Sequence, residues 1–169
     1  MQKKYFSYQK IHQTVKKIAQ DVITSAYTPD LILAIGGGGL IPARILRTFI
    51  KKPIIAVAVS YYEDIEKTKA EPFKLQWLDG VDISGKKILL VDEVDDSRVT
   101  LAYCLNELTA HQPAEIGVVV LHSKDKPKRA SFPSSVKHFF VGEYLSDVWI
   151  CYPWDSENIH EHEQCCNAD

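Results

Sequence analysis

The sequence has no long apolar run of the kind that membrane insertion requires. Across its 169 residues no stretch reaches the ~20 consecutive apolar residues of a membrane helix. The first residues, MQKKYFSYQK, also lack the apolar core of a secretion signal. We therefore expect a cytoplasmic protein with no membrane partner.

The chain also lacks an excess of charge of one sign. It carries 20 Lys and Arg against 22 Asp and Glu, a net charge of -2 at pH 7. A chain of this balance has no general attraction to a phosphodiester backbone, so we expect no nucleic-acid partner.

Cysteine is scarce, with four residues in the chain. Cys104 and Cys151 lie in apolar patterns and are expected to be buried thiols, while the adjacent Cys165 and Cys166 form no disulfide framework. The segment 156–169 adds two His to this Cys pair. It could bind a metal, but we interpret it as a mobile tail.

No repeats or low-complexity linkers divide the chain, and its length suits one domain over residues 1–169. Apolar residues after Ser7 recur with helical spacing and predict an amphipathic helix. Four apolar strands are expected, with helices in the first and third gaps, which indicates an α/β fold whose parallel sheet is covered on both faces. The helix positions are Ile11, Val15, Ile18, Ala19, Val22 and Ile23, and the strands are 31–35, 54–59, 88–92 and 116–121.

Four acids crowd into five positions directly after the third strand: Asp92, Glu93, Asp95 and Asp96. Like charges this close repel, so cations or hydroxyl donors should lie between them. A helix begins near 97–100, and its N-terminus favours a phosphate. The spacing of a calcium-binding EF-hand is absent, which leaves a solvated turn as the alternative to a phosphosugar site.

A second candidate loop, Gly36 to Gly39, follows the first strand. Glycine lets a phosphate approach the backbone closely, and Pro42 suits the first turn of the next helix. No Gly-Lys-Ser/Thr follows and the third glycine of GxGxxG is missing, so the loop by itself is weak support for a nucleotide site.

Together the two motifs resemble a known family. The segment 88–100 resembles the phosphoribosyl-pyrophosphate motif of type I phosphoribosyltransferases: a strand, two acids, two residues, Asp, a hydroxyl residue, two residues and Thr. The glycines resemble the pyrophosphate loop of the same family. The resemblance implies a central parallel sheet flanked by helices, with a small C-terminal base-binding hood. It implies that Asp92 and Glu93 bind the ribose hydroxyls, directly or through Mg²⁺. The 5-phosphate would be wrapped by Asp96, Ser97, Arg98, Val99 and Thr100, and the pyrophosphate by Gly36, Gly37 and Gly38, with a cis bond between Gly36 and Gly37.

Arg98 departs from the family pattern, which usually has Gly at this position. Its guanidinium could offset the acid cluster or donate to a phosphate, or Arg98 could be a plain surface residue.

The segment 60–80 is polar, long and studded with aromatic residues. Long loops in compact domains are often lids. In the family a flexible loop at this place closes over the active site, and Ser60 and Tyr61 resemble the pair at its start. The alternative is an exposed hairpin without a catalytic part.

The segment Ser146 to Asp155 resembles the purine-stacking segment of bacterial xanthine-guanine phosphoribosyltransferases. By this resemblance Trp149 stacks on the base and the backbone of Ile150 contacts purine position 2. Lys124, or alternatively Lys126, donates to the 6-oxo group, and Asp155 joins Asp92 and Glu93 in holding Mg²⁺. The competing interpretations are a core anchor for Trp149 and an exposed cation for Lys124.

The resemblance implies a purine phosphoribosyltransferase with Asp92, Glu93 and Asp96 as its catalytic residues. Asp96 would accept a proton from purine N7. Such an enzyme joins phosphoribosyl pyrophosphate to N9 of xanthine, guanine or hypoxanthine in purine salvage, and is usually a dimer or tetramer. Two alternatives are a non-enzymatic, nucleotide-sensing regulator on the same fold and a nucleotide-binding α/β module for another ligand.

Overall fold

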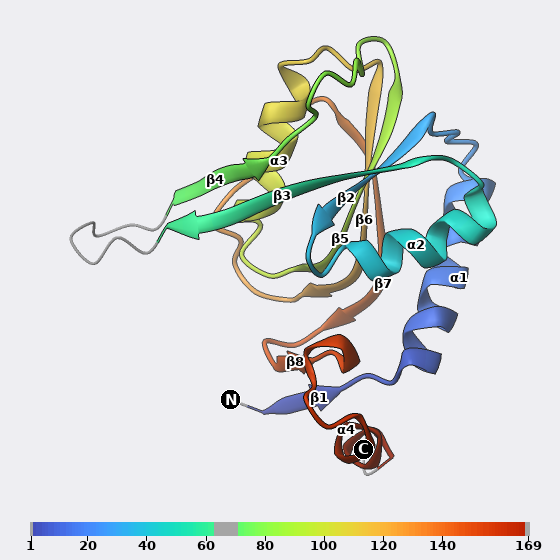
Figure 1. The fold of residues 1–169 in the computed structure, drawn as a ribbon, viewed down its shortest axis with the longest axis vertical. Coiled ribbons are helices and arrows are strands. Elements are labelled where there is room, and N and C mark those ends of the chain that lie inside the picture. Colours follow the sequence, from blue (N-terminus) through green and yellow to red (C-terminus); the bar gives the residue numbers. More distant parts are fainter. Residues whose placement is uncertain (1, 63–70, 168–169) are drawn as a thin grey trace.

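The computed structural model of the protein describes residues 2–62 and 71–167, and its centre is a six-stranded sheet (Figure 1). The strand order is β4-β3-β2-β5-β6-β7. All neighbouring strands are parallel except β3 and β4, so the expected α/β fold of the type I phosphoribosyltransferases is confirmed. The strands are β2 (Leu31–Gly36), β3 (Ile54–Tyr62), β4 (Glu71–Gln76), β5 (Lys87–Asp95), β6 (Glu115–Lys124) and β7 (Val136–Leu145).

Three helices cover the sheet: α1 (Tyr8–Thr24) and α2 (Leu40–Ile50) on one face and α3 (Val99–Thr109) on the other (Figure 1). Successive strand residues alternate between two buried clusters, with Ile32 packed under α1 and α2 and Leu33 packed under α3. The predicted apolar stripe of α1 is buried except for Ile23, which is 59% exposed. Ile23 lies one position beyond the buried Val22, and so turns away from the sheet. Among the described residues, no helix has the length and apolarity to cross a membrane.

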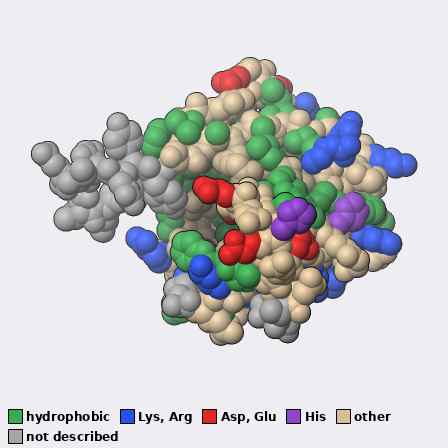
Figure 2. All heavy atoms as spheres, turned by 60° about the horizontal axis from the view of Figure 1, so that its bottom comes forward, with side chains coloured by type: hydrophobic (Ala, Val, Ile, Leu, Met, Phe, Trp, Pro, Cys, Tyr) green, Lys and Arg blue, Asp and Glu red, His purple; other side chains and the backbone are tan. Residues whose placement is uncertain are grey.

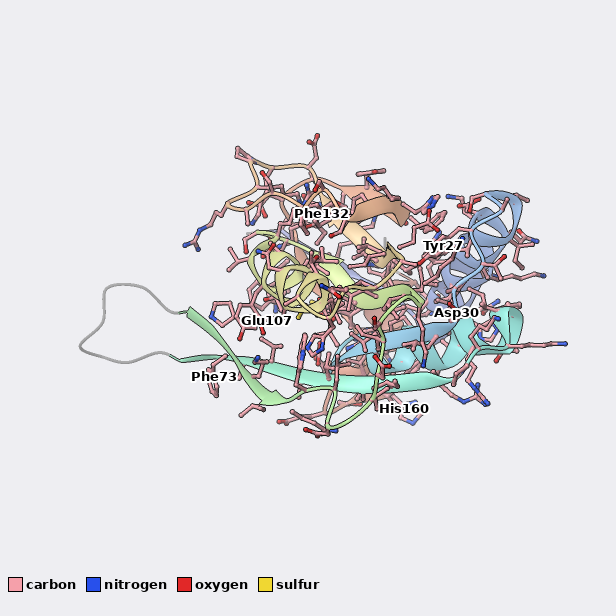
Figure 3. The ribbon with its side chains drawn as sticks, turned by 90° about the horizontal axis from the view of Figure 1, so that it is seen from above. Tyr27, Asp30, Phe73, Glu107, Phe132 and His160 are labelled. Carbon is pink, nitrogen blue, oxygen red and sulfur yellow. The ribbon has the colours of Figure 1, made fainter. Side chains whose placement is uncertain are left out.

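Side chains at the amino ends of the strands fix their alignment (Figure 3). The Tyr27 hydroxyl donates to the Ile88 carbonyl at 2.6 Å and accepts from the Gly117 N–H at 3.1 Å. The Asp30 carboxylate accepts from the Lys87 N–H at 2.8 Å. Because β2, β5 and β6 are locked at this end, their carboxyl ends emerge at a common edge.

A second, two-stranded parallel sheet joins the two ends of the chain (Figure 1). β1 (Lys3–Tyr5) pairs with β8 (Trp149–Cys151), and the short helix η1 (Pro153–Asp155) follows. Strands of three residues leave no readable periodicity, so the sequence did not predict them.

The tail differs from our expectation. Instead of a mobile segment over 156–169, the structure has a helix, α4 (Ile159–Cys166), whose N-terminus is capped by the Asn158 side chain. His162 on α4 is buried, and its Nε2 lies 2.9 Å from the Phe6 carbonyl oxygen. The partner of α4 is therefore the start of the chain, which local sequence patterns do not reveal. Residues 168–169 lie outside the described residues.

The segment 60–80, expected to be a loop, contains the paired ends of an antiparallel hairpin. β3 continues through Tyr62, β4 begins at Glu71, and residues 63–70 lie outside the described residues. On β4, Lys74 pairs with Glu107 of α3 at 2.6 Å, and Figure 3 labels Glu107 and the neighbouring Phe73. The charged residues that suggested a loop are typical of an edge strand. Whether the hairpin closes over a site stays a prediction.

Candidate active site at the carboxyl ends of the strands

The glycine loop and the acidic motif meet where the strand order reverses. From β2 the chain passes to β3 on one side, whereas β5 pairs with β2 on the other. At such a switch point the connections diverge and leave a crevice for a ligand. A Cβ on Gly38 would collide with the Glu93 carboxylate, so the two motifs are in contact. Figure 2 shows acidic side chains bordering a hollow on this face.

The absence of side chains lets the glycine loop fold tightly onto the sheet. A Cβ on Gly39 would lie 2.5 Å from the Val91 carbonyl oxygen and 2.6 Å from that of Ile35. The peptide bond between Gly36 and Gly37 is cis, as the resemblance implies. The loop therefore presents backbone to the crevice.

Asp92 is the last residue of the continuous buried run of β5, and the half-buried Glu93 follows it. Burial raises the pKa of Asp92 well above its ordinary value, and the charge of Glu93 raises it further. Asp92 Oδ1 accepts from the Glu93 N–H at 3.0 Å. A cation bound beside these two carboxyl groups would reduce their repulsion and favour ionisation of Asp92.

Asp95 points inward and is fully buried, with 0% exposure. Its carboxylate pairs with Arg98 Nη2 at 2.7 Å and with Lys128 Nζ at 3.3 Å, and it accepts from Ser123 Oγ at 3.1 Å. Burial of an ionised group requires this kind of compensation. Asp95 thus belongs to an internal ion cluster rather than to the ligand-facing acids.

Arg98 is part of this ion cluster. Its Nε and Nη2 both donate to Asp95, and its guanidinium carbon lies 4.2 Å from the ring centroid of Phe132, which Figure 3 labels. Of the roles considered for Arg98, the structure shows the one that offsets the acids. Its φ of 69° is left-handed, the conformation that glycine adopts most easily, which explains why the family pattern has Gly there. The guanidinium is therefore held between the Asp95 carboxylate and the Phe132 ring.

Asp96 faces the opposite way, toward two lysines. Its Oδ1 lies 2.5 Å from Lys126 Nζ and 3.4 Å from Lys124 Nζ, and both lysines also pair with Asp147. Partial burial raises the pKa of Asp96, but the Lys126 hydrogen bond and the two lysine charges outweigh it, so the pKa is lowered overall. Asp96 is therefore an ionised carboxylate at neutral pH.

One pocket of about 270 Å³ joins the acidic motif to the predicted base-binding residues. Lys124 lies in its wall and is 8% exposed, which excludes the exposed-cation interpretation, and Lys126 is not among the lining residues. Trp149 is 59% exposed, so it forms part of the pocket wall rather than anchoring the core. The pocket is lined by Glu93, Val94, Asp96, Lys124, Trp149, Ile150, Tyr152 and Asp155.

Tyr152 and His122 form a link that the sequence did not disclose. The Tyr152 hydroxyl donates to the Glu93 carbonyl oxygen at 3.1 Å and lies 2.7 Å from His122 Nδ1. The Tyr152 ring stacks on Trp154 at 4.6 Å. Burial lowers the pKa of His122 to about 4, so the imidazole is neutral. Because the Tyr152 O–H is donated to Glu93, the donor to the Tyr152 oxygen is the Nδ1–H of His122. His122 is on β6, 30 residues from its partner, and no spacing signal connects the two.

The oxygen donors of this site suit Mg²⁺. Within residues 2–62 and 71–167, no cluster of three or more His, Cys, Asp or Glu forms a ready-made metal cage. Magnesium usually needs only one or two carboxylates, with water and substrate phosphates completing its octahedron. Burial and the charge of Glu93 raise the pKa of Asp155, so Glu93 and Asp155 repel one another across the pocket. A cation between them would remove that repulsion.

Comparison with known proteins identifies the family. A model described as the phosphoribosyl transferase domain matches residues 1–151. The chain belongs to this family. It is 38% identical to xanthine phosphoribosyltransferase 1 of Saccharomyces cerevisiae, over 97% of this chain and 95% of the relative. It is 41% identical to the hypoxanthine-guanine phosphoribosyltransferase of Schizosaccharomyces pombe, over 94% of this chain and 92% of the relative.

Two solved structures share the fold. A hypothetical protein from Neisseria gonorrhoeae, with bound ppGpp, superposes with a TM-score of 0.93 at 43% identity and covers 99% of this chain and 97% of its own. A purine phosphoribosyltransferase from Pyrococcus horikoshii Ot3 has a TM-score of 0.79 at 23% identity, covering 94% of this chain and 97% of its own. The second likeness concerns the fold alone.

The raised pKa of Asp92 predicts a pH-dependent stability difference between the wild type and Asp92→Asn. In the folded protein Asp92 holds its proton to higher pH than in the unfolded chain, where its pKa is about 3.9. Wild-type stability should therefore fall as pH rises from that value through the raised pKa. In thermal unfolding without divalent cations, the melting temperature of Asp92→Asn should rise relative to that of the wild type as the pH increases from 4 to 8. The exposed Asp125→Asn is the control, and a gap that does not change with pH would contradict the burial argument.

Arg98→Gly should destabilise the fold even though it introduces the family residue. Glycine relieves the left-handed backbone, which is worth about 1 kcal/mol, whereas removing one partner of a buried ion pair costs about 3 to 5 kcal/mol. Lys128 and Ser123 retain part of the compensation, so we expect a net loss of roughly 1 to 2 kcal/mol in denaturant unfolding. In an Asp95→Asn background, Arg98→Gly should lower the free energy of unfolding by less, because no buried carboxylate is left without its partner. A single variant as stable as the wild type would refute the role of the pair.

Proposed function

We propose that the protein transfers the 5-phosphoribosyl group of phosphoribosyl pyrophosphate to N9 of a 6-oxopurine and releases pyrophosphate, in purine salvage. The observation that carries the proposal is the shared pocket, in which Glu93 and Asp96 line the same 270 Å³ as Lys124 and Trp149. The family match and the names of the relatives, which are purine phosphoribosyltransferases, support it.

The ribosyl donor would bind across the two loops. Asp92 and Glu93 would take the ribose hydroxyls, and Gly36, Gly37 and Gly38 would offer backbone to the pyrophosphate. The 5-phosphate would lie against residues 97–100, where α3 begins without a side-chain cap and its dipole favours an anion.

The purine would occupy the outer part of the pocket. Trp149 would supply a stacking face, Lys124 would donate to the 6-oxo group and the Ile150 backbone would contact position 2. Asp96, ionised because Lys126 and Lys124 lower its pKa, would accept the proton from N7. A purine without a 6-oxo group would leave Lys124 without its acceptor.

Asp92, Glu93 and Asp155 would hold Mg²⁺, which when bound neutralises the charge of the leaving pyrophosphate. The carboxylates would orient the ribose while charge develops on its ring, and the pocket wall would shield the reacting carbon from water. Ser60 and Tyr61 as lid residues, a dimer or tetramer as the active form, and a cytoplasmic location stay predictions.

The relatives give no support for a non-enzymatic regulator, since those named above are enzymes. The ppGpp complex of the Neisseria gonorrhoeae protein is compatible with an enzyme site, because ppGpp contains guanine, ribose and phosphates, the parts proposed to bind here.

The activity test is an assay with phosphoribosyl pyrophosphate, Mg²⁺ and each of xanthine, guanine, hypoxanthine, adenine and uracil. We expect nucleoside monophosphate and pyrophosphate from at least one 6-oxopurine and none from uracil. Asp92→Asn combined with Glu93→Gln should lower turnover by orders of magnitude and leave the melting temperature unchanged or raised, because mutual repulsion is removed. Normal turnover in the double variant would overturn the assignment of the acidic motif.

Trp149→Ala should raise KM for the purine far more than KM for the ribosyl donor, since stacking touches only the base. A stacked base is worth about 1 to 3 kcal/mol, which corresponds to a rise of roughly five- to 150-fold in the purine KM. Trp149→Phe, which keeps an aromatic face, is the matched control and should change KM much less. Equal effects on both substrates would show that Trp149 does not stack on the base.

A further inference from the structure

The ammonium group of Lys128 binds backbone carbonyls beside the site. Nζ donates to the carbonyl oxygens of Asp95 at 2.7 Å, Asp96 at 3.0 Å and Lys124 at 2.7 Å. It also lies 3.3 Å from Asp95 Oδ2, and the side chain is 16% exposed. An ammonium has three N–H donors, so no donor is left for a substrate.

The three carbonyls belong to two elements that separate at this point. The pairing of β5 with β6 ends at Asp95 and Ser123, and beyond it the chain turns toward α3 on one side and toward residue 129 on the other. Lys128 bridges the two turns after the ladder stops. A second link, from the Arg129 N–H to the Ser97 carbonyl at 3.0 Å, joins the same two turns.

The cluster of Asp95, Arg98 and Lys128 carries a net positive charge, which favours an anion nearby. Asp95 contributes one buried negative charge, whereas Arg98 and Lys128 contribute two positive charges beside it. The excess positive charge lies directly before the first turn of α3, where the helix dipole has the same sign. The cluster therefore strengthens the anion-binding character of the loop without placing a side chain in it.

We propose that Lys128 is a positioning residue that couples the two substrate sites. By holding the carbonyls of Asp96 and Lys124 on one ammonium, it fixes the proton acceptor and the 6-oxo donor relative to each other and to the 5-phosphate loop. Lys126 differs, because its ion pairs are with the carboxylates of Asp96 and Asp147. The inference rests on the proposed function, since it assigns Lys128 to the same reaction.

The test is a double-mutant cycle with Lys124. Lys128→Met keeps an unbranched apolar stem and loses the donors, and we expect KM for purine and for ribosyl donor each to rise about tenfold or more, equivalent to ~1.4 kcal/mol. If Lys128 acts on the base through Lys124, the effect of Lys128→Met on the purine KM should shrink in a Lys124→Met background. There the substitution should raise the purine KM less than about twofold while still raising the donor KM. Additive effects on the purine KM, or unchanged KM values, overturn the proposal.

Two further variants keep the result interpretable. Lys137→Met, at an exposed position on β7, should leave both KM values unchanged. If Lys128→Met does not fold, Lys128→Arg retains the charge near Asp95, but its planar group does not reproduce three carbonyl contacts, and it should raise both KM values. Wild-type KM values in a folded Lys128→Arg then overturn the coupling. A wild-type protein without phosphoribosyl transfer would instead refute the proposed function, a separate outcome.

Discussion

The close contact between the glycine loop after β2 and the carboxylates after β5 is the constraint on which the site depends. A side chain at Gly39 would collide with two strand carbonyls, so the packing requires glycine there, and one at Gly38 would displace the Glu93 carboxylate. The parallel pairing of β2 with β5 brings the two loops to one edge, and the reversal of strand order opens the crevice between them.

Around this contact the fold resolves the repulsion among four acids by giving each a different environment. Asp92 is buried and resists ionisation, and Glu93 faces the pocket. Asp95 is neutralised internally by Arg98 and Lys128, and the pKa of Asp96 is lowered by Lys126 and Lys124. Residues adjacent in sequence thus have different partners, because a strand end and a turn point them in different directions.

The segment 149–155 forms one wall of the pocket and is supported by the start of the chain. β8 pairs with β1, α4 packs against the same strand, and Tyr152 connects this small layer to the Glu93 backbone and to His122 in the main sheet. Movement of the wall that carries Trp149 would consequently disturb the acidic motif. Hydrogen bonds thus join the acidic motif to the pocket wall and the main sheet at Tyr152, and to the turn after β6 at Lys128.

The sequence by itself determined the features whose signals are local: the apolar strands, the α1 stripe, the glycine loop, and the acidic motif followed by a helix. It also brought Trp149, Lys124 and Asp155 under consideration, through resemblance. Only the tertiary structure decided the direction of each acid, the pairing of Arg98 with Asp95, the preference for Lys124 over Lys126 in the pocket wall, and the folding of the tail onto Phe6. These features depend on partners far apart in the chain. No periodicity records them, because burial and the choice of hydrogen-bond partner are settled only when the sheet, the loops and the two ends of the chain pack together.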